Sequence, residues 1–195
     1  MILNKKICVV GAGHWGKNHI KTLHGLGCLK AVVDPKKDLL KNNINLYPGI
    51  NVYTSLEKAL LENYDGYVVA TPADTHYEIA KEIIKTGKPL LIEKPMTLLV
   101  SKAEELINLA EINHVDLMVG HVLLFHPAII KIKKLIDSGS IGDIQYVYSN
   151  RLNLGKVRTQ ENVFWSFAPH DIAVFQYLIN STPIKVNSFG SSFLQ

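Results

Sequence analysis

The chain has 195 residues, of which 47% are hydrophobic, and its 21 basic and 17 acidic residues give a net charge of +4. This composition describes a globular core and excludes a disordered chain. Because the chain contains no run of five like charges, neither nucleic acid nor a membrane surface is indicated as a partner. No apolar run approaches the ~20 residues of a membrane span, and the two cysteines lack metal-ligand spacing, so we expect a reduced, cytoplasmic protein.

Short apolar runs alternate with helical patterns through the first 122 residues. The clearest helical pattern covers residues 75–86, where Ile79, Ala80, Ile83 and Ile84 share one face before Gly87 ends the helix. Strands are predicted at residues 7–10, 31–33, 52–53, 67–70, 90–92 and 117–119. This alternation predicts an α/β fold, a doubly wound parallel Rossmann sheet over residues 1–122, which binds ligands at the carboxyl ends of its strands.

A different pattern follows from residue 123 to residue 195. It reads as a helix at 127–136, a turn at 138–142, an alternating strand at 144–152, a polar loop, an apolar helix at 165–179 and a strand at 184–189. We therefore expect a second α+β domain over residues 123–195, for substrate binding or oligomerisation.

A glycine-rich turn follows the first predicted strand and opens a helix. Gly11, Gly13 and Gly16 allow a tight turn whose backbone amides face a pyrophosphate, and Asp34 ends the second strand, where a carboxylate accepts the ribose hydroxyls of an adenosine. The alternative is a tight turn with a surface aspartate. We assign NAD binding to Gly11, Gly13, His14, Trp15, Gly16 and Asp34.

Two further motifs close the fourth and fifth predicted strands, Ala70-Thr71-Pro72 and Glu93-Lys94-Pro95. Both reach the sheet edge where a nicotinamide would lie, so Thr71, Pro72, His76, Glu93 and Lys94 join the predicted cofactor site. Burial and a neighbouring cationic ring both favour the neutral amine of Lys94, which could then act as a base. The alternative is an exposed loop lysine in a lysine-rich chain.

These motifs, with His170-Asp171-Ile172 downstream, resemble the Gfo/Idh/MocA oxidoreductase family along the whole chain. The resemblance implies hydride transfer from a sugar hydroxyl carbon to NAD, with Lys94 and His170 flanking the sugar as the acid/base pair. Taken alone, His170 could equally be a structural histidine at a helix start. His76 and His121 are expected near the cofactor, and no metal site is expected because ligand spacing is missing.

The stretch from Trp165 to Asp171 is similar to the branch of the family that oxidises UDP-N-acetylhexosamines at C3. Ser166 stands where many members have an aspartate four residues before the histidine, and Asp171 is expected to replace that acid in part. The only two arginines, Arg151 and Arg158, lie in one segment. Their planar guanidinium groups suit a diphosphate, although solvated loop arginines are an alternative. Predicted substrate contacts are Arg151, Arg158, Trp165, His170 and Asp171.

Family members continue past this length with strands that complete the second sheet. An incomplete sheet leaves unpaired edges and an apolar face. We therefore expect a homo-oligomer or a complementing polypeptide to cover them. The function expected is NAD-dependent oxidation of a nucleotide sugar; the alternative is a non-catalytic NAD-binding regulator or a truncated, inactive member of the family.

Overall fold

A computed structural model describes residues 5–152 and 162–191 of the chain. Its centre is a six-stranded parallel sheet with the strand order β3-β2-β1-β4-β5-β6. The strands are β1 (Ile7–Val10), β2 (Leu29–Val33), β3 (Asn51–Tyr53), β4 (Gly66–Val69), β5 (Leu90–Ile92) and β6 (Leu117–Val119). The doubly wound Rossmann sheet is thereby confirmed, with every strand of this half within two residues of its predicted bounds.

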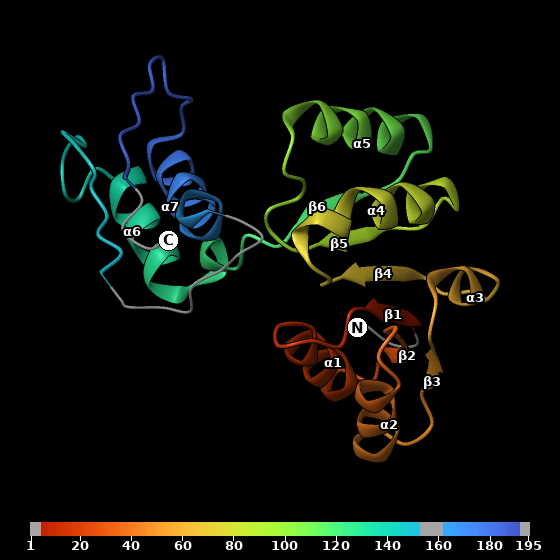
Figure 1. Cartoon of the computed structure of the whole chain (residues 1–195). Coiled ribbons are helices and arrows are strands. Elements are labelled where there is room, and N and C mark those ends of the chain that lie inside the picture. Colours follow the sequence, from red (N-terminus) through yellow and green to blue (C-terminus); the bar gives the residue numbers. More distant parts are fainter. Residues whose placement is uncertain (1–4, 153–161, 192–195) are drawn as a thin grey trace.

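Helices cover both faces of this sheet (Figure 1). One face carries α1 (Gly16–Gly25) and α2 (Lys37–Leu46), and the other carries α4 (His76–Lys85) and α5 (Val100–Ile112). Two short helices, α3 (Leu56–Leu60) and the 3-10 turn η1 (Ala73–Thr75), complete the connections. Covering on both faces explains why the strands are continuous apolar runs rather than alternating ones.

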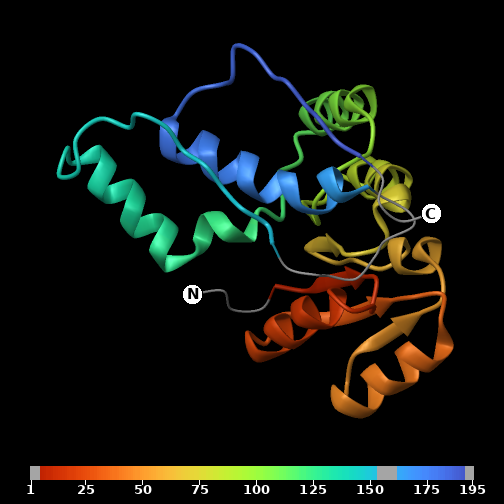
Figure 2. The same ribbon diagram turned by 60° about the vertical axis from the view of Figure 1, so that its left-hand side comes forward.

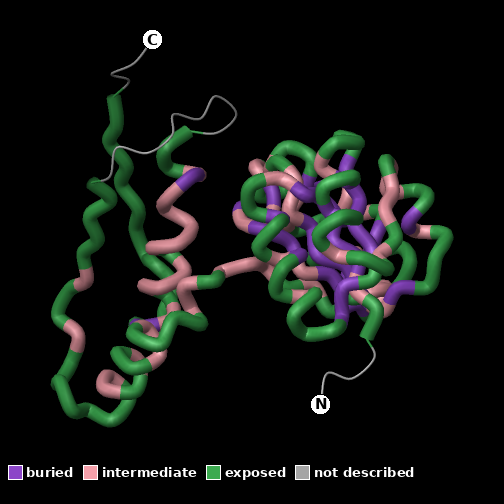
Figure 3. The backbone as a smooth tube through the Cα atoms, turned by 90° about the horizontal axis from the view of Figure 1, so that it is seen from below, coloured by how far each residue is buried: buried purple, intermediate pink, exposed green. Residues whose placement is uncertain are grey.

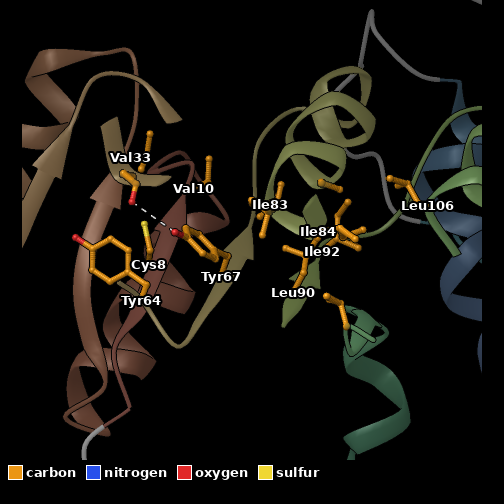
Figure 4. Close-up of a cluster of buried hydrophobic side chains, with 14 of the residues drawn as sticks. Cys8, Val10, Val33, Tyr64, Tyr67, Ile83, Ile84, Leu90, Ile92 and Leu106 are labelled. Atoms are coloured by element: carbon orange, nitrogen blue, oxygen red, sulfur yellow. Dashed lines mark hydrogen bonds between the residues drawn. The ribbon is translucent and has the colours of Figure 1, made fainter. Parts of the chain in front are cut away.

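The larger of two apolar cores lies between the sheet and the α4 and α5 face (Figure 4). Ile83 and Ile84 of α4 pack with Ile92 of β5 and Leu106 of α5, and all four are fully buried. Burying one such side chain contributes about 1.5–3 kcal/mol. A second core, built around Ile20, Val32 and Leu40, lies under α1 and α2.

The strand register aligns the carboxyl ends of the central strands. Val10 of β1 lies opposite Val33 of β2 and Val69 of β4, and Ile92 of β5 lies opposite Val69 and Val119 of β6. The residues that follow these strands therefore share one edge of the sheet. They are Gly11, Asp34, Ala70, Glu93 and Gly120.

A helical lobe, formed by the described residues from 122 onward, lies beside this sheet lobe of residues 5–121 (Figure 2). It contains the 3-10 turn η2 (Val122–Phe125) and two helices, α6 (Pro127–Asp137) and α7 (Val163–Ile179), which pack on each other. The side chain of Asn162 caps α7 by accepting from Trp165 N at 3.0 Å, so the helix begins earlier than residue 165. No helix in the described ranges is long and apolar enough to cross a membrane.

The predicted strands at 144–152 and 184–189 are wrong for the described part of the chain. Neither segment forms a backbone hydrogen-bond ladder, and within the described residues no strand follows β6. Their apolar side chains face solvent: Ile184 and Phe189 are fully exposed and Tyr146 is 79% exposed. Alternation predicts a strand only where a partner completes the hydrogen-bond ladder. Figure 3 shows the resulting contrast, with buried residues concentrated in the sheet lobe.

Candidate active site

The glycine-rich turn between β1 and α1 is shaped by close backbone contacts. Gly11 has a φ of +99°, and a β-carbon there would lie 2.6 Å from Ala70 O. A β-carbon at Gly16 would collide with Gly11 O, whereas one at Gly13 would meet nothing within 4 Å. Gly13 therefore leaves open space above the backbone amides at the start of α1. That cradle fits the pyrophosphate of a dinucleotide.

Asp34 holds this turn from the end of β2. Its buried carboxylate accepts from Ala12 N at 2.8 Å and from Lys36 N at 2.9 Å, one bond to each oxygen. Each carboxylate oxygen has two acceptor positions, so both bonds leave capacity for ribose hydroxyls. Asp34 is thus placed as predicted and also fixes the glycine turn.

A cavity of about 310 Å³ lies between the carboxyl edge of the sheet and α7. It brings together residues that are far apart in the sequence, among them several of those predicted for the site, including Lys94, Arg151 and His170. Its lining consists of Trp15, Ala70, Thr71, Ala73, His76, Glu93, Lys94, Val122, Arg151, Ser166, Phe167 and His170. The sheet lobe and the helical lobe therefore both contribute to the cavity.

Lys94 reaches across this cavity to the helical lobe. Its Nζ donates to the main-chain oxygen of Ser166 at 2.9 Å, in the first turns of α7. The ammonium and the start of α7 are thereby joined, with His170 on the same cavity wall.

His170 is a partly buried imidazole with a free acceptor position. Its Nδ1 is buried and has no hydrogen-bond partner among the described residues. Burial lowers the pKa of His170, and the positive charges of Lys94 and Arg151 lower it further. His170 is therefore neutral at pH 7, the form that can accept a proton.

Asp171, expected to replace the missing acid in part, raises the pKa of His170 through its negative charge. It accepts from Arg151 Nε and Nη2 and from Ser149 Oγ, each at 3.0 Å. Burial alone would raise the pKa of Asp171, but the hydrogen bonds from Arg151 and Ser149 outweigh it and lower the pKa. Adjacent helix residues point in different directions, which is why Asp171 turns to Arg151 while His170 faces the cavity.

Glu93 forms a cluster that includes one residue missed in the sequence. Its carboxylate accepts from Trp15 Nε1 at 2.6 Å and pairs with His19 Nε2 at 2.7 Å. That residue is His19, and the available signal was its spacing, because Trp15 and His19 are four residues apart and so lie on one side of the start of α1. His121, which follows β6, also has a buried Nδ1 without a partner among the described residues, and burial lowers its pKa.

His76 ties two strand-end loops together at the wall of the cavity. It is almost completely buried, with Nδ1 2.8 Å from Pro95 O and Nε2 2.9 Å from Thr71 O. His14, Pro72 and Trp165 do not line the cavity. Arg158, the second predicted diphosphate contact, lies outside the described residues.

Comparison with known proteins agrees with this geometry. Residues 5–121 match the Gfo/Idh/MocA family, described as an oxidoreductase family with an NAD-binding Rossmann fold. The chain is 27% identical to the UDP-N-acetylglucosamine 3-dehydrogenase of Acidithiobacillus ferrooxidans, over 97% of the chain and 59% of that protein. It is 26% identical to an inositol 2-dehydrogenase of Rhizobium meliloti, over 92% of the chain and 56% of that protein.

Among solved structures, GenD2 from gentamicin A biosynthesis, in complex with NAD, is 29% identical with a TM-score of 0.67. That match covers 72% of this chain and 41% of GenD2. The chain spans a little more than half the length of the curated relatives it matches.

Proposed function

The chain belongs to the Gfo/Idh/MocA family of oxidoreductases, and from this premise we propose that it oxidises a secondary hydroxyl of a sugar with NAD. The observation that carries the proposal is the cavity at the sheet edge, which Lys94 and His170 both line below the glycine turn. NAD, when bound, supplies the acceptor for the hydride. The residues of the chain then have to position the sugar and remove one proton.

Lys94 and His170 have different roles at the reacting hydroxyl. His170 is neutral and offers an imidazole nitrogen, so it can accept the hydroxyl proton as the carbon loses its hydride. Lys94 is fixed by the oxygen of Ser166, which holds the ammonium at the cavity. From there it can donate a hydrogen bond to the same hydroxyl oxygen or exchange a proton with it.

The substrate proposed is a nucleotide sugar, with C3 of a UDP-N-acetylhexosamine as the site of oxidation. Two features support it: the similarity to a UDP-N-acetylglucosamine 3-dehydrogenase, and Arg151, whose guanidinium lines the cavity. Arg151 keeps its Nη1 group beyond the two donors given to Asp171, so a phosphate oxygen could still be bound. The inositol 2-dehydrogenase relative favours a free polyol as the second candidate.

One measurement tests the reaction: NADH formation with a panel of UDP-N-acetylhexosamines, the free sugars and myo-inositol. We expect turnover with a UDP-sugar, and a loss of roughly 10² to 10⁴ in turnover in Lys94→Met and in His170→Ala, as for general acid/base groups. Lys85→Met is the matched control, because Lys85 lies on the exposed face of α4. If the chain binds NADH but oxidises none of these compounds, that result would contradict the proposed enzymatic function and favour an NAD-binding regulator.

A second measurement tests the diphosphate contact. Replacing Arg151 and Arg158 together by alanine should weaken UDP binding, at about 1.5–3 kcal/mol for each charged hydrogen bond lost. Calorimetry follows the binding. If the double variant binds UDP as tightly as the wild type, the substrate is instead expected to be a polyol or a sugar without a nucleotide.

A covering partner for the helical lobe also belongs to the proposal. Exposed apolar residues along both extended segments support it, among them Tyr148, Leu152 and Val186. If a second copy of the chain covers the helical lobe, analytical ultracentrifugation should show a dimer. A monomer would instead favour a complementing polypeptide.

A further inference from the structure

The carboxylate of Glu93 contacts two parts of the sheet lobe, the start of α1 and the backbone of Lys94. It lies directly after β5 and is 9% exposed. Oε1 receives the indole N–H of Trp15 at 2.6 Å and lies 2.7 Å from His19 Nε2, while Oε2 receives the N–H of Lys94 at 3.2 Å. One side chain therefore contacts both the start of α1 and the backbone of the residue assigned to proton transfer.

Glu93 is ionised in this setting. Burial alone would raise its pKa, but the hydrogen bonds from His19 and Trp15 outweigh burial and lower the pKa. Hydrogen bonds to a charged acceptor are shorter and stronger than neutral ones, which agrees with the 2.6 and 2.7 Å distances. The bonds to Glu93 are therefore strong enough to fix the first turn of α1.

That turn is the one that presents the dinucleotide cradle. Trp15 directly precedes α1, which begins at Gly16, and His19 lies one turn further along the same face. A shift of these two residues would move the backbone amides that follow Gly11 and Gly13. The position of the cradle relative to Lys94 thus depends on Glu93.

Gly120, at the end of β6, fits closely against the same carboxylate. A β-carbon there would lie 3.1 Å from Cδ, Oε1 and Oε2 of Glu93. Such contacts are tighter than ordinary van der Waals distance, so the carboxylate would have to move by a few tenths of an ångström. Glycine at position 120 leaves the Glu93 carboxylate in place against the strand end.

We propose that Glu93 is a positioning residue, whose carboxylate holds the glycine turn in its NAD-binding conformation through Trp15 and His19. Because the same carboxylate accepts the N–H of Lys94, one group sets both the cofactor cradle and the lysine backbone. The inference deepens the proposed function and rests on its use of NAD. Glu93 acts through its neighbours and is assigned no proton transfer.

Three variants test this role. Glu93→Gln keeps the size of the side chain but removes its charge, and Gly120→Ala displaces the carboxylate without changing it. Gly25→Ala is the matched control, because a β-carbon at Gly25, at the end of α1, would meet nothing within 4 Å. Each variant is titrated with NADH, and the two indole N–H signals are followed by NMR, with Trp165 as the internal reference for Trp15.

Glu93→Gln should weaken NADH binding on the order of ten- to a hundredfold, the usual effect of weakening hydrogen bonds to a charged group. Gly120→Ala should weaken it less, in the same direction, and both variants should shift the Trp15 signal and leave that of Trp165. Gly25→Ala should stay within about twofold of the wild type.

NADH affinity within about twofold of the wild type in both Glu93→Gln and Gly120→Ala would overturn the proposal and leave Glu93 a purely structural ion pair. If Glu93→Gln does not fold, Gly120→Ala decides alone. No sugar turnover is needed for this readout. Weaker NADH binding in a protein that oxidises no sugar would therefore support the role of Glu93 and contradict the proposed function.

Discussion

Replacing Arg151 with alanine should loosen the attachment of the extended segment at 143–152 to α7. Two guanidinium nitrogens donate to Asp171 at 3.0 Å. Such charged hydrogen bonds contribute about 1.5–3 kcal/mol each when well shielded. However, the Arg151 side chain is 40% exposed, and exposed pairs contribute about 0.2–1 kcal/mol. We expect a coupling energy between Arg151→Ala and Asp171→Ala of about 1 kcal/mol at pH 7.

The assay is urea unfolding of a double-mutant cycle, followed by fluorescence in a Trp15→Phe background where Trp165 of α7 is the only tryptophan. The pKa of Asp171 is lowered in the folded state, so its contribution to stability is complete above the ordinary value of 3.8. That contribution is lost as pH falls through the lower, folded pKa. The coupling energy should therefore be smaller near pH 3 than at pH 7. A value below about 0.5 kcal/mol at pH 7, the error for independent sites, would refute the pairing.

Three further outcomes are expected. NADP should bind at least about tenfold more weakly than NAD, because Asp34 would face the 2′-phosphate and like charges ~4 Å apart cost about 1–4 kcal/mol; equal affinity in a titration would contradict this. Gly13→Ala should keep the wild-type unfolding midpoint but weaken NADH binding, whereas Gly16→Ala should lose both; wild-type binding by Gly13→Ala would disprove the open cradle. NMR titration should give a pKa of His170 below 6.5 in the folded protein. Its contribution to the free energy of unfolding is then constant above pH 6.5. As the pH falls below that value, the contribution declines, because the unfolded chain binds the proton before the folded chain does. A midpoint at or above 6.5 would contradict the burial of His170.

The Rossmann half could be predicted from the sequence because each of its strands is a short apolar run with buried neighbours on both faces. The register then places Gly11, Asp34 and Glu93 at one edge, as their positions directly after strands had indicated. In the helical lobe the same reasoning gave two strands that do not form. Alternating residues such as Tyr146 and Tyr148 indicate a strand only when another strand provides hydrogen-bond partners.

Motifs in the sequence indicated several residues of the candidate site, but not their contacts. Motifs led to Lys94 and His170, yet nothing in a linear sequence shows that the lysine would be held by the oxygen of Ser166, 72 residues away. The pairing of Asp171 with Arg151 depends on how an extended segment lies against α7, which local propensity does not encode. The same holds for His19, whose partner Glu93 belongs to a distant strand.

The bond from Lys94 to Ser166 has a dynamic consequence. It links the sheet lobe to the helical lobe, the two parts that lie next to each other in Figure 3. Any movement that separates Lys94 from α7 has to break this bond, which raises the free energy of the separated state. In an open molecule the ammonium would return to bulk water, and His170 would lose its neighbouring charge. Lobe separation would therefore take apart the arrangement of Lys94 and His170 on which the proposed function depends.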